Sequence, residues 1–497
     1  MKLTERIRHQ GALLFVASVV AASASGQQVN YREELLGNLP APEYEQGIPT
    51  AATAQRMLDQ LLYQRAVQMY LWALPAVGMQ QYRVANASAM GGGSDDYKVG
   101  YLGDLLKSSL VHLTGNPDSV YVDYFFDTSK GPIVLEVPPT LPGFLDDMWQ
   151  RPVVDVIQPV SPSGRYLIVP PDWKGTAPAG FVVAKPQTYV SWLLLRGNVG
   201  KDGDTAVAVA DIKKLKIYPL SELGKAPSRP LQFFNISDAK IDRVPPEGLP
   251  FFERLGELVE HEHPFMQDPY NMGILSALGM ESGKPFKPDD RTRQILTLAA
   301  ETGQGMARTL TFRNEADKKI WPDRKFVMPF IGGDPNFTVN GRVLLDARAY
   351  FFYAACGTSK LMTSKTPGVG QAYPSGEMTG DGQYLAGDKT YKLHLPPKIP
   401  AKLYWSITLY DTQTRSILPN GTTAARISSF TNPVTNPDGS YDLYFGPTPV
   451  VGHEQNFVKT VPGKGWFFLF RLYGPEEAYF NGQWKPGDLV EVKSDGD

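Results

Sequence analysis

The chain has 497 residues, of which 42% are hydrophobic and 20% are charged, and its formal net charge is −2. A chain of this length can form two or more domains with cores of their own. Because no block of Lys and Arg provides the concentrated positive field that phosphate binding needs, the composition argues against a nucleic-acid partner.

The N-terminus has the features of a secretory signal peptide. Basic residues precede an apolar run at residues 12–24, which ends in the small-residue pattern Ala-Ser-Ala. The run is shorter than the roughly 20 residues that a membrane-spanning helix needs, so we expect no membrane span. We expect cleavage near Ala24 to Gly26, removal of residues 1–26, and a periplasmic or secreted protein.

The next part of the chain is expected to be a helix followed by short strands. Residues 27–55 form an irregular lead-in, and from Ala52 to about Met79 apolar residues recur at helical spacing, in a helix that Pro75 should end or kink. Short apolar runs between Pro and Gly follow, among them GPIVLEVPP, GRYLIVPPDW and LKIYPL, and this pattern is typical of a β-sandwich or barrel. We place an N-terminal β domain with its leading helix at residues 56–222.

Residues 247–315 return to helical periodicity within a connector that we place at residues 223–340. The segment KPDDRTRQILTLAAETGQGMARTL begins at an Asp N-cap. Its apolar stripe is predicted at Ile295, Ala299, Met306 and Leu310.

A helix-like segment from Val343 leads into a second set of strands, in a C-terminal domain at residues 341–492. The strands are expected in KTYKLHLPP, KLYWSITLYD, GSYDLYFGP, GWFFLFRLYGP and GDLVEVK. Short alternating runs and an Asp-Gly turn favour antiparallel pairing. The predicted fold class is therefore mainly β with a helical connector (α+β), built from two antiparallel β-sandwich domains.

Several long motifs, in this order, resemble one family. AVQMYLWALPAVGMQQYR, LTGNPDSVYVDYFFDTSKGPIVLEVPP and GRYLIVPPDWKGTAPAGFVVAKPQTYVSWLLLRG resemble a domain of unknown function numbered 1254. YLAGDKTYKLHLPPKIPAKLYWSITLYDTQTRS and TVPGKGWFFLFRLYGPEEAYFNGQWKPGD resemble a domain of unknown function numbered 1214. Exported bacterial proteins pair the two domains, and the resemblance covers roughly residues 60–220 and 340–490.

The resemblance implies jelly-roll-like sheets and a homo-oligomer, but no established reaction. The chain departs from the family pattern at DVIQPVSPS, where a Gly/Lys-rich loop is often found, and at Phe457, where a tryptophan is common. A ligand role for that loop is therefore not carried over.

Asn116, Asp118 and Tyr121 match the family's Asn-x-Asp-x-x-Tyr turn, and two interpretations stay open. Asn and Asp often hydrogen-bond the backbone two residues further on, so the first interpretation is a turn that leads into a buried strand. Alternatively, Asp118 is a general base or hydrogen-bond acceptor at a cleft, with Asn116 and Tyr121 beside it. A single carboxylate is a weak signal, because glycoside hydrolysis usually needs two.

Substrate-contacting candidates elsewhere also have structural alternatives. The tryptophans are either a platform for sugar rings or core residues, and Asp381-Gly382 also suits a turn. A guanidinium in the middle of FFLFRLYGP needs either a buried ion pair or an anionic ligand, and Arg196 raises the same question. These candidates are Trp149, Asp155, Asp381, Trp405, Asn456 and Arg471.

The sequence signals no metal site and no cofactor. No HExxH, CxxC or EF-hand spacing is present, and the cluster VEHEHP places its histidines on different sides of a helix. No G-x-S-x-G elbow or phosphate-binding loop occurs. The single cysteine, Cys356, lies in an apolar run and is expected to be buried and unreactive.

Two functional hypotheses follow. The first is an exported hydrolase-like enzyme that acts on a small organic or carbohydrate-like substrate in an inter-domain cleft, with Asp118, Asn116 and Tyr121 as catalytic residues. The second is a non-catalytic ligand-binding or cell-envelope-associated protein whose aromatic-rich sheets hold a small molecule.

Overall fold

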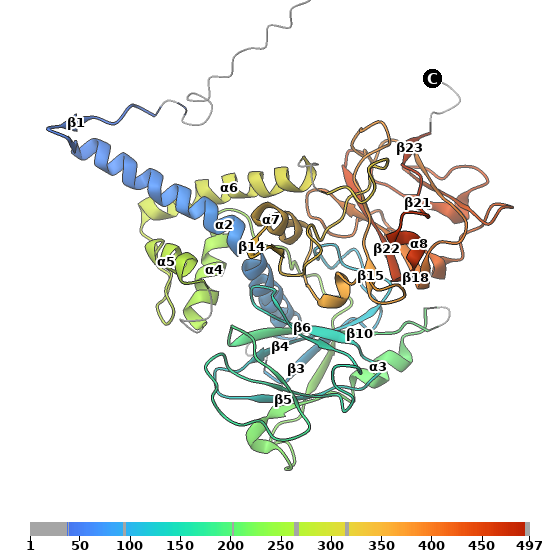
Figure 1. Ribbon diagram of the computed structural model, residues 1–497, viewed down its shortest axis with the longest axis horizontal. Coiled ribbons are helices and arrows are strands. Elements are labelled where there is room, and N and C mark those ends of the chain that lie inside the picture. The colour runs from blue at the N-terminus through green and yellow to red at the C-terminus, as the bar shows by residue number, and fades with distance from the viewer. Residues whose placement is uncertain are drawn as a thin grey trace, which may run out of the picture. The chain divides into compact units, whose positions relative to one another are not determined.

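A computed structural model describes residues 37, 39–92, 96–200, 203–262, 268–313 and 318–492 (Figure 1). The proposed signal peptide, residues 1–26, lies outside the described residues. The chain divides into two compact units, Met1–Leu58 and Asp59–Asp497. In the first unit, strands β1 (Tyr44–Glu45) and β2 (Ile48–Pro49) form a small hairpin. All packing described below lies within the second unit.

Helix α2 (Ala51–Ala89) confirms the predicted helix but does not end at Pro75. A proline inside a helix removes one backbone hydrogen bond and costs about 3 kcal/mol. The residues on both sides of it, among them Leu74 and Ala76, are fully buried, and their burial offsets that cost. The carbonyl of Pro75 also accepts a hydrogen bond from Gln150 Nε2 at 2.9 Å.

The N-terminal β region contains two open sheets. The six-stranded sheet has the order β12-β3-β4-β10-β6-β7, and the four-stranded sheet has the order β11-β5-β8-β9. Side chains of both sheets and of helix α3 (Ala206–Ile212) share one apolar cluster. The strands are β3 (Lys98–Tyr101), β4 (Val120–Asp127), β5 (Ile133–Glu136), β6 (Gly143–Asp147), β7 (Pro152–Val156), β8 (Arg165–Ile168), β9 (Val182–Ala184), β10 (Val190–Gly197), β11 (Lys216–Pro219) and β12 (Gln232–Asn235).

Helices follow, as the periodicity predicts. They are α4 (Leu249–His261), α5 (Pro269–Ala277), α6 (Asp290–Phe312) and, after a short hairpin of β13 (Thr338–Val339) and β14 (Arg342–Val343), α7 (Leu345–Ala354). Asp289 caps α6 by accepting a hydrogen bond from the Thr292 N–H, which confirms the Asp N-cap. The predicted stripe is wrong at Met306, which is exposed, because the buried face runs one position later through Leu296, Ala299, Ala300, Gly303 and Ala307.

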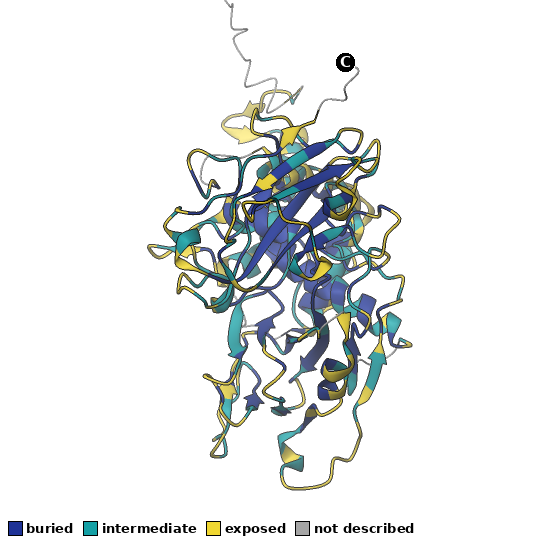
Figure 2. Cartoon of the chain, turned by 90° about the vertical axis from the view of Figure 1, so that its right-hand side faces the viewer, coloured by how far each residue is buried: buried dark blue, intermediate teal, exposed yellow. Residues whose placement is uncertain are grey.

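The C-terminal β region also contains two open sheets that share one apolar cluster. The first has the order β15-β22-β18-β19, with β16 also paired to β22, and the second has the order β21-β20-β17-β23. Figure 2 shows this region facing the viewer, with its central strands buried. The strands are β15 (Gln371–Ala372), β16 (Ser375–Gly376), β17 (Tyr391–Leu395), β18 (Ala401–Asp411), β19 (Arg426–Ser428), β20 (Tyr441–Gly446), β21 (Phe457–Lys459), β22 (Trp466–Pro475) and β23 (Val490–Glu491), and short helices are η2 (Leu220–Glu222), η3 (Lys360–Met362), η4 (Ser429–Thr431), η5 (Glu454–Asn456) and α8 (Glu477–Phe480).

The fold is a mixture of helices and open sheets. Helix makes up about 27% and strand about 26% of the structure, so the predicted mixture of helices and sheets is confirmed, but the two are about equal rather than mainly β. The long helices α2 and α6 both lie where the sequence predicts helices, and α2 continues past the expected end near Met79 to Ala89. Pairing is antiparallel except for β3 with β12, β8 with β9, and β20 with β21. Among the described residues, no helix has the length and apolar character needed to span a membrane.

Candidate functional site

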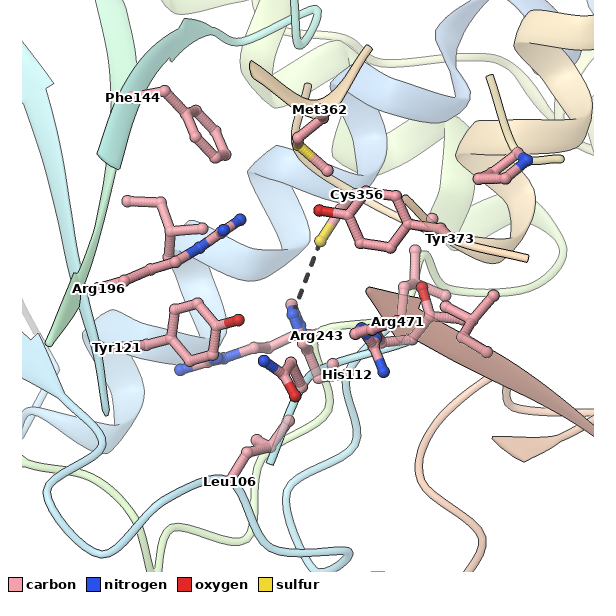
Figure 3. A pocket seen from close by; sticks show the side chains of 18 of the residues that line it. Leu106, His112, Tyr121, Phe144, Arg196, Arg243, Cys356, Met362, Tyr373 and Arg471 are labelled. Atoms are coloured by element: carbon pink, nitrogen blue, oxygen red, sulfur yellow. Dashed lines mark hydrogen bonds between the residues drawn. The ribbon is translucent and has the colours of Figure 1, made fainter. Parts of the chain in front are cut away.

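A cavity of about 90 Å³ lies between the two β regions. Strands β4, β6 and β10 line it from the N-terminal region, β22 lines it from the C-terminal region, and α2 and α7 contribute side chains as well. Figure 3 shows the cationic and aromatic side chains that converge on it.

Strand alternation explains which side chains reach the cavity. Successive residues of a strand point to opposite faces. In β22, Phe468, Phe470 and Leu472 are fully buried in the C-terminal core, and the intervening Leu469, Arg471 and Tyr473 line the cavity. In β10, Leu193 and Leu195 enter the N-terminal core, and Trp192, Leu194 and Arg196 line the cavity.

Arg471 is 3% exposed and makes only neutral hydrogen bonds. Its Nη2 donates to the Thr114 carbonyl at 2.7 Å, and its Nη1 donates to Thr408 Oγ1 at 3.3 Å. Its guanidinium also lies 5.7 Å from the ring centroid of Tyr410. Within the described part of the chain, no carboxylate forms an ion pair with Arg471, so the first of the two alternatives from sequence, a buried ion pair, is not found there.

Arg196 stands at the end of β10, directly across from Tyr121 of β4 in the strand register. Its guanidinium is 5.9 Å from the Tyr121 ring, and its buried Nε has no hydrogen-bond partner. No carboxylate among the residues that the structure describes lies within ion-pair distance of it. Figure 3 shows Arg196 and Arg471 entering from opposite sides, with Tyr121 and Tyr373 between them.

A third guanidinium, that of Arg243, is neutralised from behind the cavity. Its Nη2 lies 3.5 Å from Asp123 Oδ2, and its Nη1 donates to the Tyr82 hydroxyl at 2.8 Å. Asp123 also accepts hydrogen bonds from Tyr82 and from Trp192 Nε1. Three guanidiniums therefore line the cavity and only that of Arg243 is paired with a carboxylate of the described residues, which leaves an excess of positive charge.

The other polar groups of the cavity are neutral donors. Burial raises the pKa of Tyr373 and of Tyr473, so both hydroxyls keep their protons at neutral pH. Asn116 Nδ2 donates to the Tyr473 hydroxyl at 2.6 Å. Asn116 is thereby fixed at the cavity wall.

Cys356 and His112 form a neutral pair in the cavity, with 3.6 Å between Sγ and Nε2 (dashed line in Figure 3). Burial and the nearby Arg243 lower the pKa of His112, so the imidazole is uncharged. Burial raises the pKa of Cys356 to about 12, which keeps the thiol protonated. The thiol is half-buried rather than fully buried, because it borders the cavity, and its protonated state agrees with the predicted unreactive cysteine.

A second hollow of about 430 Å³ adjoins the cavity. The two share Phe144, Arg196 and Tyr473 as lining residues. Tyr404 and Phe430 also line this outer hollow. We refer to the two spaces as the inner cavity and the outer hollow.

The turn at Asn116 forms as the structural interpretation predicts. Asn116 Oδ1 accepts a hydrogen bond from the Asp118 N–H at 3.1 Å, which is the expected bond two residues on. The Asp118 carboxylate lies buried at the edge of the outer hollow and forms an ion pair with Arg426. Asn116 and Tyr121 line the inner cavity, whereas Asp118 does not.

Of the six substrate-contacting candidates from sequence, only Arg471 reaches the inner cavity, where Arg196 lies as well. Trp149 packs against Trp72, and Trp405 packs in the C-terminal core. Asn456 bonds the backbone of Val434 and Asp442, Asp155 lies in β7, and Asp381 is exposed in a turn. None of these five lines the inner cavity or the outer hollow.

Sequence reasoning missed most of the cavity. His112, Arg243, Tyr373 and Tyr473 come from separate segments, and no local motif links them. For Tyr473 a signal exists, because it stands two positions after Arg471 and shares its strand face. Among the described residues, no group of three or more His, Cys, Asp or Glu is arranged to hold a metal ion.

The fold and cavity define an α+β protein with two β regions and a cationic cavity between them. Residues 104–219 match the family model described as protein of unknown function DUF1254, and residues 370–477 match protein of unknown function DUF1214. The two matched segments stand in the order that the motifs indicate, with DUF1254 N-terminal and DUF1214 C-terminal.

A solved structure from Vibrio parahaemolyticus shares this fold. The crystal structure of the VPA0106 protein from Vibrio parahaemolyticus is 18% identical, with a TM-score of 0.54 over 87% of this chain and 100% of that chain. An uncharacterized protein from Burkholderia cenocepacia is 13% identical, with a TM-score of 0.41 over 89% of this chain and 97% of that chain. No curated protein matches the chain.

Proposed function

We propose that the protein binds a small organic anion, of the carboxylate class, in the inner cavity. The observation that carries the proposal is the pair of inward-pointing guanidiniums of Arg196 and Arg471, for which no described residue supplies a carboxylate partner. A buried charge is costly unless it is paired and hydrogen-bonded. A bound carboxylate supplies the missing charge, and guanidinium groups suit it because their N–H donors match its two oxygens.

The neutral groups around the two cations support the same ligand class. The hydroxyls of Tyr121 and Tyr373 lie between Arg196 and Arg471 (Figure 3), and tyrosine hydroxyls can donate hydrogen bonds to anions. The rest of the wall is largely apolar, with Leu106 and Phe144 among its residues. This combination of a few converging polar groups in an apolar cavity is typical of small-molecule sites.

A hydrolase that uses Asp118 remains the alternative. In its favour, Asp118 borders the outer hollow beside Ser119 and Tyr404. Against it, the carboxylate is held in an ion pair with Arg426, and a general base must be able to reach the proton that it abstracts. We therefore favour ligand binding over hydrolysis.

Sequence features add the cellular setting to this proposal. The basic and apolar N-terminus supports export to the periplasm or beyond, by way of a signal peptide. The shared core of the paired sheets supports a sandwich arrangement of the jelly-roll kind in each β region. The family resemblance supports a homo-oligomer.

The test is a screen of organic acids by thermal shift, with each acid paired to its neutral amide. We expect carboxylates to raise the melting temperature and amides to leave it unchanged, because only the anion neutralises the two cations. The Arg471→Met variant should lose the response. A response to no acid, or an equal response of wild type and variant, would contradict the proposal.

A further inference from the structure

We infer that the ligand is an amphipathic carboxylate, whose anionic head occupies the inner cavity and whose apolar body extends into the outer hollow. The inference rests on the proposed anion binding and adds the part of the ligand that the inner cavity does not hold. It also assigns Phe430 and Leu403, which neither the family resemblance nor the sequence singled out, as determinants of ligand length.

The first observation is size. An apolar protein cavity of about 150 Å³ holds a benzene molecule. The inner cavity, at about 90 Å³, therefore has room for a carboxylate and only a few further atoms. The outer hollow is larger, at about 430 Å³.

The second observation is continuity. Phe144, Arg196 and Tyr473 line both spaces, so a ligand whose carboxylate contacts Arg196 lies at the boundary between them. An anion with a body longer than a few atoms must cross this boundary. The side chains that it meets there are aromatic rings and one guanidinium.

The third observation is a series of rings that leads from the boundary to the surface. Tyr473 and Tyr404 stack with centroids 4.0 Å apart and an interplanar angle of 15°. Tyr404 and Phe430 follow at 4.7 Å and 39°. Burial raises the pKa of Tyr404, so this ring stays neutral, and together the three rings offer an uncharged face to an apolar or aromatic body.

The outer end of the hollow exposes large apolar side chains that local structure holds in place. Phe430 is 49% exposed and Leu403 is 70% exposed. Phe430 lies in η4, which is fixed by a capping box in which Ser428 accepts from the Phe430 N–H at 3.2 Å. Leu403 lies where the pairing of β18 with β22 shifts register, and such irregularities re-aim side chains beside binding sites.

Together these features specify the chemical class of the ligand. Arg196 lies at the inner end of the outer hollow, so the charged head of the ligand should be an anion rather than a cation. The rings and Leu403 select an alkyl or aryl body, because polar bodies gain nothing from covering exposed apolar surface.

The experiment is a titration of straight-chain carboxylates from acetate to decanoate, with the matching primary alcohols as neutral controls. For wild type, we expect affinity to rise about three- to fourfold per methylene once the chain is longer than the inner cavity, as apolar burial predicts. The alcohols should bind at least tenfold more weakly. The Phe430→Ala and Leu403→Ala variants should lose part of the rise with chain length and keep the affinity for short acids.

A matched control and the other outcomes separate the two proposals. Tyr270→Ala removes a ring that is 77% exposed and lines neither space, so it should behave as wild type. If acids bind through Arg471 with an affinity that does not depend on length, the inference fails and the proposed function stands. If no acid binds, or if alcohols bind as tightly as acids, the proposed function fails and the inference with it.

Discussion

The Arg196→Met substitution should raise the stability of the ligand-free protein and lower its affinity for carboxylates. Methionine keeps an unbranched apolar stem that can fill the space, and it removes the charge. Arg196 has a buried Nε without a hydrogen-bond partner, so the substitution breaks little that stabilises the fold. Replacing an unpaired, partly buried ion by an apolar side chain should therefore stabilise the ligand-free protein.

The magnitudes follow from general energetics. Replacement of buried ions by apolar residues is neutral or stabilising by about 1–4 kcal/mol, and half-burial of Arg196 places it near 1 kcal/mol. With an unfolding entropy of about 2.1 cal/mol/K per residue, this chain length gives roughly 1 °C per kcal/mol. The lost charge-assisted hydrogen bond, about 1.5–3 kcal/mol, should weaken carboxylate binding by roughly 10- to 150-fold.

The assay is thermal unfolding of wild type and variant, each with and without a saturating carboxylate. A ligand at about one hundred times its Kd stabilises the native state by about 2.7 kcal/mol, so wild type should gain roughly 3 °C. Without ligand, the variant should melt about 1 °C higher than wild type, and the carboxylate should leave its melting temperature almost unchanged. If instead it melts several degrees lower and still responds to the acid, Arg196 has a structural role and the reasoning is refuted.

Three further predictions concern groups outside the two unpaired cations. Asp118→Asn should remove the ion pair with Arg426 and lower the free energy of unfolding by about 1–3 kcal/mol. The affinity for carboxylates should stay unchanged, and a loss of binding in a titration of the folded variant would contradict this. Burial raises the pKa of Glu262 to about 7, so between about pH 4.5 and 7 the native state keeps a proton that the unfolded chain loses. The free energy of unfolding should therefore fall by about 3 kcal/mol as the pH rises from about 4.5 to 7. Denaturation curves of Glu262→Gln, measured across the same pH range, should lack this fall. With a pKa of about 12, Cys356 should react with a thiol reagent at pH 8 roughly a thousandfold more slowly than after denaturation, and equal rates would refute the protonated thiol.

Local sequence signals were sufficient for the strands and helices. Apolar runs bounded by proline and glycine predicted β5, β8 and β11, and the helical period together with the Asp289 cap predicted α6. They were insufficient where tertiary burial decides the outcome. Pro75 is the clearest case, because its local cost favours a helix end and the packing of its neighbours favours continuation.

The site was harder to predict than the fold because its residues meet only after the two β regions pack together. Arg471 stood out in sequence, since a charge between large apolar residues of one strand needs a partner. Its neighbours across the cavity come from distant segments: Arg196 is on β10, and Tyr373 lies between β15 and β16. Asp118, the sequence candidate with the most familiar catalytic chemistry, proved to be paired with Arg426, which no local pattern indicates.

A crystal structure of the protein with the tightest-binding carboxylate tests the account most directly. We expect the carboxylate group between the guanidiniums of Arg196 and Arg471, within hydrogen-bond distance of both or of one cation and a tyrosine hydroxyl. Electron density for the ligand elsewhere, with these two arginines turned toward protein carboxylates, would contradict the account.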